Sequence, residues 1–343
     1  MRDDHPCFSV ISGDFIEAIL SETKPQIIDL VQQGYLLHHH RKTINPDSYF
    51  LRFDDKPEAR IIALPAAVRD LDGGLSVSGI KWIGSYPRNI DVNLQRASAV
   101  VILNDYETGY PFACLEASQI SAARTAASAV LATRHLHGDG KRARSLSVIG
   151  AGVIARTILA YFDADDWQFD DVCVHDLSTS HRDAFVRNVG KTSRWPVRSA
   201  SLGDALDASI VVLATTAAAP WIDADHSWRA DQVVLNVSLR DLPPETILGS
   251  NNVLDDVDHC MKANTSPHLA FQRYGHRDFV NGTLAQIIEG EARLDTKKPT
   301  IFSPFGLGLL DLCVSMFLYR QGVEKGKDYA VPNFFPNTER WSR

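Results

Sequence analysis

The chain is 343 residues long, with 45% hydrophobic and 22% charged residues. This length is enough for two packed domains and too great for one ordinary core. The formal net charge of −7 argues against partners that need a basic surface, namely nucleic acid and the membrane surface.

The cysteine pattern and the N-terminus indicate a cytoplasmic protein. The five cysteines form an odd, dispersed set without a CxxC pair, which favours a reducing compartment and gives no zinc motif. The N-terminus lacks the pattern of a signal peptide, and no apolar run approaches the roughly 20 residues of a membrane span. We therefore expect cytoplasmic localisation and no membrane partner.

The first part of the chain is predicted to form a mixed sheet. Short apolar strands are predicted at Arg60–Pro65 and Ala97–Asn104. The three consecutive histidines His38, His39 and His40 cannot all face one metal ion from a regular helix or strand, so we interpret them as loop or helix-end residues. The glycines that punctuate further extended segments are Gly73, Gly74, Gly79 and Gly84.

An Ala-rich run from Leu115 to His137 has apolar residues near helical spacing and predicts one long helix that leads into the second domain. Beyond it, short apolar strands surround a helical segment at Val153–Phe162, which predicts a parallel sheet with helical crossovers. The tail from Ile301 onward predicts a helix that is apolar on more than one side and packs back on the first domain. The predicted strands are Leu146–Ile149, Val172–His175, Ile210–Ala214 and Val233–Val237.

A glycine-rich motif directly follows the strand Leu146–Ile149 and precedes the predicted helix. Residues 150–155, GAGVIA, have the G-x-G-x-x-A pattern of a dinucleotide-binding turn. Gly150 permits the tight turn, Gly152 lets backbone N–H groups approach a pyrophosphate, and the small Ala155 lets helix and strand pack closely. The alternative is that the glycines only make a tight turn.

Asp176 closes the second predicted strand, where a carboxylate can accept hydrogen bonds from the ribose hydroxyls and would repel a 2′-phosphate. This position predicts NAD rather than NADP. Two alternatives remain open: Asp176 could cap the following helix, and the nearby Arg182 could accommodate NADP.

Four cations with apolar or small neighbours are candidates for binding an anionic substrate: Arg52, Lys81, Arg124 and Arg240. A cation in such a setting needs a carboxylate or phosphate partner, since burying an unpaired charge is costly. From pattern alone, a structural salt bridge is the simpler interpretation of any one of them.

Asp241 follows the strand that ends at Val237, and the C-terminal ends of parallel strands are where substrates bind in such folds. A catalytic carboxylate fits this position, but residues 241–245, DLPPE, also fit the start of a helix capped by Asp241. The acidic group Asp255, Asp256, Asp258 and His259 superficially suggests a metal site. Solvated loop or helix-end residues explain that group better, and we expect no metal.

Several segments together resemble the ornithine cyclodeaminase/mu-crystallin superfamily over nearly the whole chain. The resemblance implies an α/β fold, in which a doubly wound Rossmann parallel sheet in residues 121–304 binds NAD. It also implies a mixed α+β domain for substrate binding and dimerisation in residues 1–120 and 305–343, and a homodimer joined through this domain. The segments that carry the resemblance are Gly79-Ile80-Lys81, Leu103-Asn104-Asp105 with Thr108-Gly109, Ser121–Ala126 and the GxGxxA unit.

More narrowly, four segments are similar to a branch of the family in siderophore biosynthesis: Ile80–Ile83, Ser238–Leu242, Asn264–His268 and Ser303–Gly308. That branch oxidises N-(2-amino-2-carboxyethyl)-L-glutamate with NAD and, by hydrolysis of an imine, releases 2,3-diaminopropionate and 2-oxoglutarate. The resemblance thus implies an oxidoreductase with a small anionic amino acid as substrate. The alternatives are ornithine cyclodeamination, reduction of a cyclic ketimine, and a mu-crystallin-like nucleotide-binding protein with little turnover. Cyclodeaminases carry a lysine shortly after the catalytic aspartate where this chain has Glu245, which argues against ornithine cyclisation.

The resemblance also implies the site residues. In the family, the residues matching Lys81 and Arg52 hold the substrate carboxylate, and the one matching Arg124 lies near cofactor and substrate. We also count Lys81 as catalytic, and our own candidate for the remaining carboxylate is Arg240. Asp241 matches the catalytic aspartate, which accepts a proton from the secondary amine and then helps water attack the imine. The cofactor is lined by Ser98, Arg124, Gly150, Gly152, Val153, Ile154, Asp176, Thr216 or the adjacent Thr215, Ser238, Leu239 and Ser303.

Overall fold

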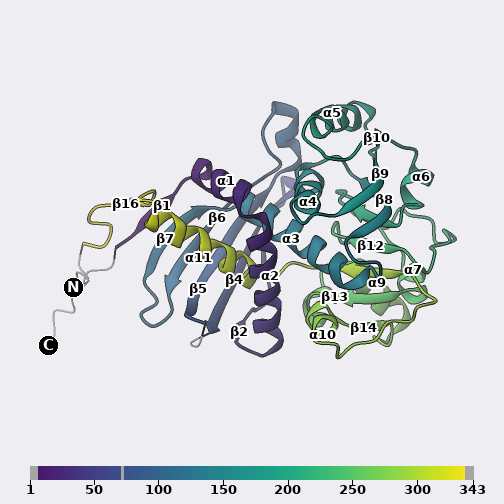
Figure 1. Cartoon of the computed structure of the whole chain (residues 1–343). Helices are drawn as coiled ribbons and strands as arrows, with labels where there is room; N and C mark the ends of the chain where they lie inside the picture. Colours follow the sequence, from purple (N-terminus) through teal and green to yellow (C-terminus); the bar gives the residue numbers. More distant parts are fainter. Residues whose placement is uncertain (1–6, 71–72, 337–343) are drawn as a thin grey trace. The chain divides into compact units, whose positions relative to one another are not determined.

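The computed structural model describes residues 7–70 and 73–336 (Figure 1). The chain divides into two compact units: unit 1 ends at Arg124 and resumes at Leu307, and unit 2 runs from Thr125 to Gly306. The sequence-based boundaries fall slightly earlier in the chain, after residues 120 and 304. None of the described helices is long and apolar enough to cross a bilayer.

Unit 1 contains, within the described residues, a mixed eight-stranded sheet in the order β16-β1-β7-β6-β5-β4-β2, and β3 pairs with another part of β4. The neighbours β1 and β7 are parallel and the other pairs are antiparallel, so the predicted mixed sheet is confirmed. Gly79 and Gly84 lie inside β5 and do not interrupt it. The strands are β1 (Ser9–Ile11), β2 (Thr43–Ile44), β3 (Tyr49–Phe53), β4 (Lys56–Asp70), β5 (Leu75–Ser85), β6 (Ala97–Asp105), β7 (Pro111–Glu116) and β16 (Tyr329–Ala330).

The two faces of this sheet differ in burial. Leu64, Lys81, Val101 and Leu115 are cross-strand neighbours on β4, β5, β6 and β7, and all four are buried. The helix α11 (Gly308–Glu324) packs against these strands and against α2 (Lys24–His39). In Figure 1 it lies across the strands of unit 1. Unit 1 also contains the helix α1 (Gly13–Glu22), which precedes α2, and a short 3-10 helix, η1 (Pro87–Val92), which precedes β6.

The prediction for the C-terminal tail is partly right. Residues 308–315 of α11 are all buried, as expected of a helix that is apolar on several sides and packs on the first domain. The prediction that this helix begins at Ile301 is wrong, because β15 (Thr300–Ser303) is a fully buried central strand between β12 and β13. A short run of buried apolar residues fits a central parallel strand as well as a helix, and periodicity alone does not separate the two.

Unit 2 contains, within the described part of the chain, an eight-stranded parallel sheet in the order β10-β9-β8-β11-β12-β15-β13-β14. The strand order reverses between β8 and β11, as in a doubly wound sheet, so the predicted Rossmann-type α/β fold is confirmed. The long predicted helix is α3 (Ser118–Leu136), which begins three residues after Leu115 because Leu115 belongs to β7.

The strands of unit 2 are β8 (Arg142–Ile149), β9 (Gln168–His175), β10 (Val197–Ser199), β11 (Ile210–Leu213), β12 (Val233–Asn236), β13 (Asn251–Leu254), β14 (Val280–Thr283) and β15. Its other helices are α4 (Val153–Ala164), α5 (Thr179–Val189), α6 (Leu202–Leu206), α7 (Pro244–Gly249), α8 (Val257–Cys260), α9 (Ser266–Tyr274) and α10 (Leu284–Ile288). Because all strands run the same way, the loops after β8, β9, β11, β12 and β15 leave from one edge of the sheet.

Gly79 is a position in β5 where a methyl group has no room. A Cβ atom there would lie 2.3 Å from the backbone carbonyl oxygen of Ile102 and 3.1 Å from Leu312 Cδ2. We expect Gly79→Ala to lower the free energy of unfolding by about 1–3 kcal/mol, measured by urea denaturation, because the backbone of β6 must shift. Gly138→Ala is the control, since a Cβ at Gly138 meets nothing within 4 Å. Equal losses in the two variants would contradict the steric explanation.

Candidate active site

The turn between β8 and α4 has the geometry of a phosphate-binding turn. Gly150 has φ +101°, and a Cβ there would lie 2.5 Å from the carbonyl oxygen of Ala214, so only glycine fits. Gly152 is the N-cap of α4 without a side-chain cap, and a Cβ on it would meet nothing within 4 Å. Ala155 is fully buried under the first turn. The uncapped helix start and the open space at Gly152 fit a pyrophosphate group.

Asp176 lies beside this turn. Its Oδ2 accepts a hydrogen bond from the backbone N–H of Ala151 (2.7 Å), and its Oδ1 accepts one from the N–H of Ser178 (2.8 Å). The N-cap of α5 is Ser178, which accepts from the N–H of His181, so the idea that Asp176 caps this helix is wrong. Arg182 donates through Nε to Asp183 (3.0 Å). A carboxylate at the end of β9 fits the ribose hydroxyls of a dinucleotide.

Asp241 is completely buried and held by three side chains of unit 2. Thr215 and Trp221 donate hydrogen bonds to its Oδ1, and Ser238 Oγ lies within hydrogen-bond distance of its Oδ2. Burial raises the pKa of Asp241, while the bonds from Thr215 and Trp221 oppose the shift. The alternative that Asp241 caps a helix is wrong, because the N-cap of α7 is Pro243 and no side chain caps it.

Proton counting supports a neutral form of Asp241. Ser238 Oγ lies 3.0 Å from the carbonyl oxygen of Leu213, which can only accept a hydrogen bond. A hydroxyl has one proton to donate, so it cannot donate to Leu213 and to an ionised Asp241 at the same time. If Asp241 carries a proton on Oδ2, it donates to Ser238 and every contact is satisfied. The pocket therefore suits a carboxyl group that gains and loses a proton.

The loop that carries Asp241 is strained and braced. Leu239 has φ +79°, and Ala263 and Asn264 both have φ +55°, a region that costs a side-chain-bearing residue about 1–3 kcal/mol. Arg240 donates from Nε (3.2 Å) and Nη2 (2.8 Å) to the carbonyl oxygen of Ala263. Arg240 thus connects the two loops, in addition to any contact with a substrate.

In unit 1 a buried ion cluster surrounds Lys81. Its Nζ donates to Asp311 Oδ2 (2.7 Å) and to Ser121 Oγ (3.1 Å), and Arg124 Nε donates to Asp311 Oδ1 (3.3 Å). Lys81 is 1% exposed and Asp311 is 0% exposed. Burial lowers the pKa of Lys81 to about 8, the charge of Asp311 opposes this shift, and the charge of Arg124 adds to it. Both the salt-bridge interpretation and the substrate-binding interpretation of Lys81 and Arg124 remain compatible with this geometry.

Sequence reasoning missed Asp311 and Trp221. Asp311 is the one acidic residue in the buried segment 308–315 of α11, and an acid inside a leucine-rich helix is a signal that it has a buried cation as partner. Trp221 gave no such signal, because its role depends on the position of its indole N–H against Asp241.

Two other predicted site residues lie apart from the Lys81 cluster. Arg52 is exposed on β3, opposite Arg60 in the register, with its guanidinium carbon 5.3 Å from the centre of the Phe50 ring. Arg52 shares a sheet face with Lys81, because their partners on β4, Arg60 and Leu64, are four residues apart. This offset corresponds to about 13 Å along the strand direction. Ser98 pairs with Gly84 and is exposed on the opposite face from Lys81, so the structure does not bring these two together.

The remaining predicted cofactor residues lie at the C-terminal edge of the parallel sheet. Val153 and Ile154 form the first turn of α4. Thr216 is exposed after β11, whereas the hydroxyl of Thr215 is engaged with Asp241. Ser303 ends β15, is buried, and accepts a hydrogen bond from Asn236 Nδ2 (3.1 Å).

From the sequence, we interpret the two groups weighed as a metal site as loop or helix-end residues. His38 and His39 end α2 and His40 is its C-cap, so the helix-end interpretation is confirmed for them. It is also confirmed for Asp256, the N-cap of α8, whereas Asp258 is exposed. The loop or helix-end interpretation is wrong for Asp255, which is buried and accepts hydrogen bonds from the N–H groups of Phe305 (2.9 Å) and Gly306 (2.7 Å). His259 is buried too, and its ring contacts Asp256.

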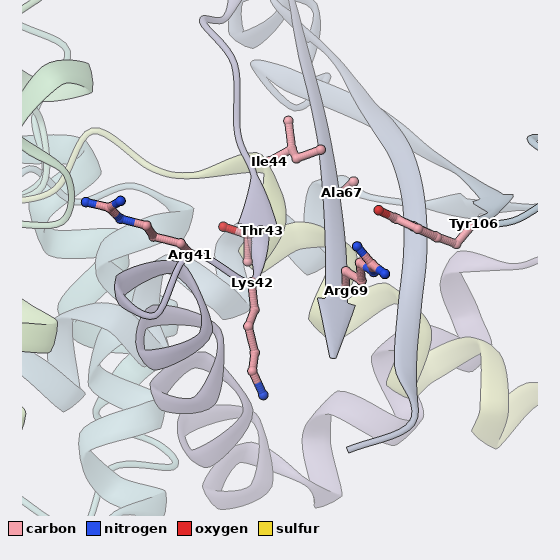
Figure 2. Close-up of a pocket in the computed structure, with 7 residues that line it drawn as sticks. All are labelled: Arg41, Lys42, Thr43, Ile44, Ala67, Arg69 and Tyr106. Atoms are coloured by element: carbon pink, nitrogen blue, oxygen red, sulfur yellow. The ribbon is translucent and has the colours of Figure 1, made fainter. Parts of the chain in front are cut away.

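A hollow of about 440 Å³ in unit 1 is lined by charged residues, but these do not form an anion site. Figure 2 shows that Arg41 and Lys42 point away from Arg69 and Tyr106. Lys42 also donates to Asp70 Oδ1 (2.9 Å). Cations that diverge cannot grip one small ligand. The other lining residues are Thr43, Ile44 and Ala67.

Comparison with known proteins connects this geometry to a family. N-((2S)-2-amino-2-carboxyethyl)-L-glutamate dehydrogenase of Staphylococcus aureus is 30% identical over 316 residues, which cover 87% of this chain and 90% of that protein. The Δ(1)-pyrroline-2-carboxylate reductase of Thermococcus litoralis, solved with NADH and L-proline, has a TM-score of 0.84 at 22% identity, covering 94% of this chain and 99% of that chain. An archaeal alanine dehydrogenase dimer with bound NAD also has a TM-score of 0.84, at 20% identity, covering 96% and 100%.

A family model described as ornithine cyclodeaminase/mu-crystallin family matches residues 19–326, which include all of unit 2, most of unit 1 and every candidate site residue. The chain therefore belongs to the ornithine cyclodeaminase/mu-crystallin family.

Proposed function

We propose that this protein is an NAD-dependent dehydrogenase that oxidises the C–N bond of N-(2-amino-2-carboxyethyl)-L-glutamate. Hydrolysis of the resulting imine gives 2,3-diaminopropionate and 2-oxoglutarate. The observation that carries the proposal is the buried ammonium of Lys81, held beside Arg124 by Asp311. The substrate follows from the relative of Staphylococcus aureus, which bears that name and matches most of both chains.

Unit 2 binds the cofactor. Gly152, Val153 and Ile154 at the start of α4 would hold the pyrophosphate, and Asp176 would accept hydrogen bonds from the ribose hydroxyls. The cofactor is NAD, because a carboxylate at the end of β9 repels a 2′-phosphate and Arg182 is already paired with Asp183. When bound, NAD accepts the hydride that leaves the substrate Cα. Leu239, Thr216 and Ser303 lie on the same sheet edge and complete the cofactor-binding set.

Unit 1 binds the substrate carboxylate. An ammonium has three protons to donate, and the acceptors of Lys81 among the described residues are Asp311 and Ser121. The third proton is directed to a substrate carboxylate, beside the guanidinium of Arg124. Arg52 on the same sheet face, and Arg240 in unit 2, serve the further carboxylates of this multiply anionic substrate.

Asp241 supplies the acid–base chemistry. It accepts a proton from the secondary amine as the C–N bond is oxidised, which leaves a neutral imine and a protonated Asp241. It then gives that proton to the nitrogen as water adds to the imine carbon, and takes back the proton that the water loses. As the C–N bond of the adduct breaks, Asp241 protonates the leaving nitrogen and accepts the hydroxyl proton, which releases keto acid and amine. Its burial and its contact with Ser238 favour the protonated form, whereas the hydrogen bonds that Thr215 and Trp221 donate to it favour the ionised form, and the cycle uses both.

Reduction of a cyclic ketimine is the second candidate function. It is favoured by the same network, because a neutral Asp241 is the state that donates a proton when an imine is reduced. Ornithine cyclisation has less support, since Glu245 follows Asp241 where cyclodeaminases carry lysine, and Glu245 is paired with Arg273.

A substrate screen tests the proposal. We expect N-(2-amino-2-carboxyethyl)-L-glutamate with NAD to produce NADH, followed by absorbance at the nicotinamide band, together with an equal amount of 2-oxoglutarate. Ornithine with NAD should give no net NADH. Consumption of NADH with a cyclic ketimine but no reaction with the glutamate conjugate would select the second function, and tight NAD binding without turnover would select neither.

The proton transfer at Asp241 predicts a selective loss in Asp241→Asn. We expect kcat to fall by at least about 100-fold, because the amide cannot accept the proton, while the Kd for NAD changes by less than about 2-fold. Stopped-flow turnover and calorimetric NAD titration measure the two values. Asp139→Asn, the same change at an exposed position, is the control. Full turnover in Asp241→Asn would remove this residue from the mechanism.

We also propose that the protein is a homodimer joined through unit 1. Tyr49, Trp82 and Val100 lie in one cross-strand row on the sheet face away from α11, and they are 66%, 43% and 38% exposed. Leu51 extends this row and is 46% exposed. A contiguous exposed apolar face of this kind fits an interface between two copies.

This interface predicts the behaviour of Trp82→Glu. The new charge would be buried between the two copies, so we expect the dimer to dissociate at micromolar concentration, measured by sedimentation velocity. Val323→Glu changes an apolar residue of similar exposure on α11 and should leave the dimer intact. A wild-type monomer, or a Trp82→Glu dimer as stable as the wild type, would disprove this interface.

A further inference from the structure

We propose that Asp311 is a positioning residue of the carboxylate-binding site: its two oxygens hold Lys81 and Arg124 side by side and keep Lys81 as the ammonium ion. This inference rests on the proposed substrate-binding role of Lys81. Asp311 does not contact substrate in this scheme and acts through the two cations.

The geometry supports a shared carboxylate. Asp311 Oδ2 accepts from Lys81 Nζ at 2.7 Å, and Asp311 Oδ1 accepts from Arg124 Nε at 3.3 Å. Each cation therefore has its own oxygen, and the spacing of the two oxygens fixes the spacing of the two cations. The three side chains come from β5, α3 and α11, so this arrangement exists only when all three elements are packed.

Burial makes the carboxylate necessary. Lys81 is 1% exposed and Arg124 is 12% exposed, so water screens their mutual repulsion weakly. Two like charges in such a place would favour loss of the lysine proton, since a guanidinium does not lose its own. A neutral amine has no charge with which to attract a carboxylate. Asp311 prevents this loss.

The groups that face Lys81 are few in the described part of unit 1. Its cross-strand neighbours Leu64 on β4 and Val101 on β6 are apolar. From α11 it faces Asp311, and from α3 it faces Arg124 and Ser121. Cys313, two residues from Asp311 on α11, has a pKa raised to about 12 by burial and stays neutral through the relevant range. The pKa of Lys81, lowered to about 8, therefore depends on Asp311 and Arg124 in opposite directions.

Opposite shifts in two variants test the role. In the wild type, substrate binding should weaken as pH rises through about 8, because Lys81 is protonated only below its pKa. We call this fall in affinity with rising pH the limb. In Asp311→Asn the limb should move to lower pH, and KM at pH 8 should rise by about 10- to 100-fold with a smaller change in kcat. In Arg124→Gln the limb should move to higher pH, although binding is weaker overall. Asp139→Asn should leave the limb in place.

Charge and packing are separated by two further variants. Asp311→Glu keeps the charge and should keep the limb nearer to that of the wild type than Asp311→Asn does. Lys81→Arg in the Asp311→Asn background should remove the limb, because arginine keeps its proton. Should Asp311→Asn fail to fold, as judged by circular dichroism, the upward shift in Arg124→Gln remains the test. An unmoved limb in Asp311→Asn, or no upward shift in Arg124→Gln, would overturn the proposal.

A binding readout distinguishes this proposal from the proposed function. Glutarate, an unreactive dicarboxylate, is titrated into the NAD-loaded protein by calorimetry across the same pH range. Wild type that binds glutarate with a limb near pH 8 but oxidises no substrate would refute the proposed reaction and leave the role of Asp311 standing. Glutarate binding that is independent of pH in the wild type and in Asp311→Asn would refute the role of Asp311 itself.

Discussion

A single buried carboxylate connects three elements of unit 1 at the position where a substrate is proposed to bind. Asp311 lies on the C-terminal helix α11 and bonds to Lys81 on β5 and Arg124 on α3, which are distant in the sequence. Charges can be buried in this way only when each has a partner in good geometry, because removing one partner leaves the other unpaired in a medium of low dielectric constant. The return of the chain to unit 1 after unit 2 is therefore a condition for the lysine to be charged, and the binding group cannot form before the fold is complete.

In unit 2 the candidate site residues are brought together by the parallel sheet. Its parallel strands all end at one edge, so loops that are far apart in the sequence gather there without any long-range charge pairing. Strain and burial are concentrated at this edge: Gly150 and Leu239 have positive φ, and Asp241 has a raised pKa inside a closed set of hydrogen bonds. Such features persist only where the surrounding structure determines them strongly, and they are common at sites that bind or react.

In the proposed function, the buried ion cluster of unit 1 and the loop edge of unit 2 serve two parts of one reaction. Binding the carboxylate and transferring a hydride to or from the adjacent carbon are needed for a nicotinamide-dependent oxidation or reduction of a C–N bond next to a carboxylate. A glutamate-conjugate dehydrogenase, a pyrroline-carboxylate reductase and an alanine dehydrogenase all match this chain, and the latter two show that the fold is shared. In the proposed function, Arg52 and Arg240 bind the further carboxylates and so contribute to the choice of substrate.

The sequence by itself determined the parts of this protein that depend on neighbouring residues. The turn from Gly150 to Ala155, the parallel strands around it and the mixed sheet of unit 1 all follow from local spacing, because periods of two and of 3.6 residues are properties of short segments. Only the tertiary structure decided that Ile301 belongs to a strand, that Ser98 faces away from Lys81, and that Asp311 is the partner of Lys81. Strand order, the face of a sheet and the partner of a buried charge depend on contacts between distant segments, and no local pattern records them.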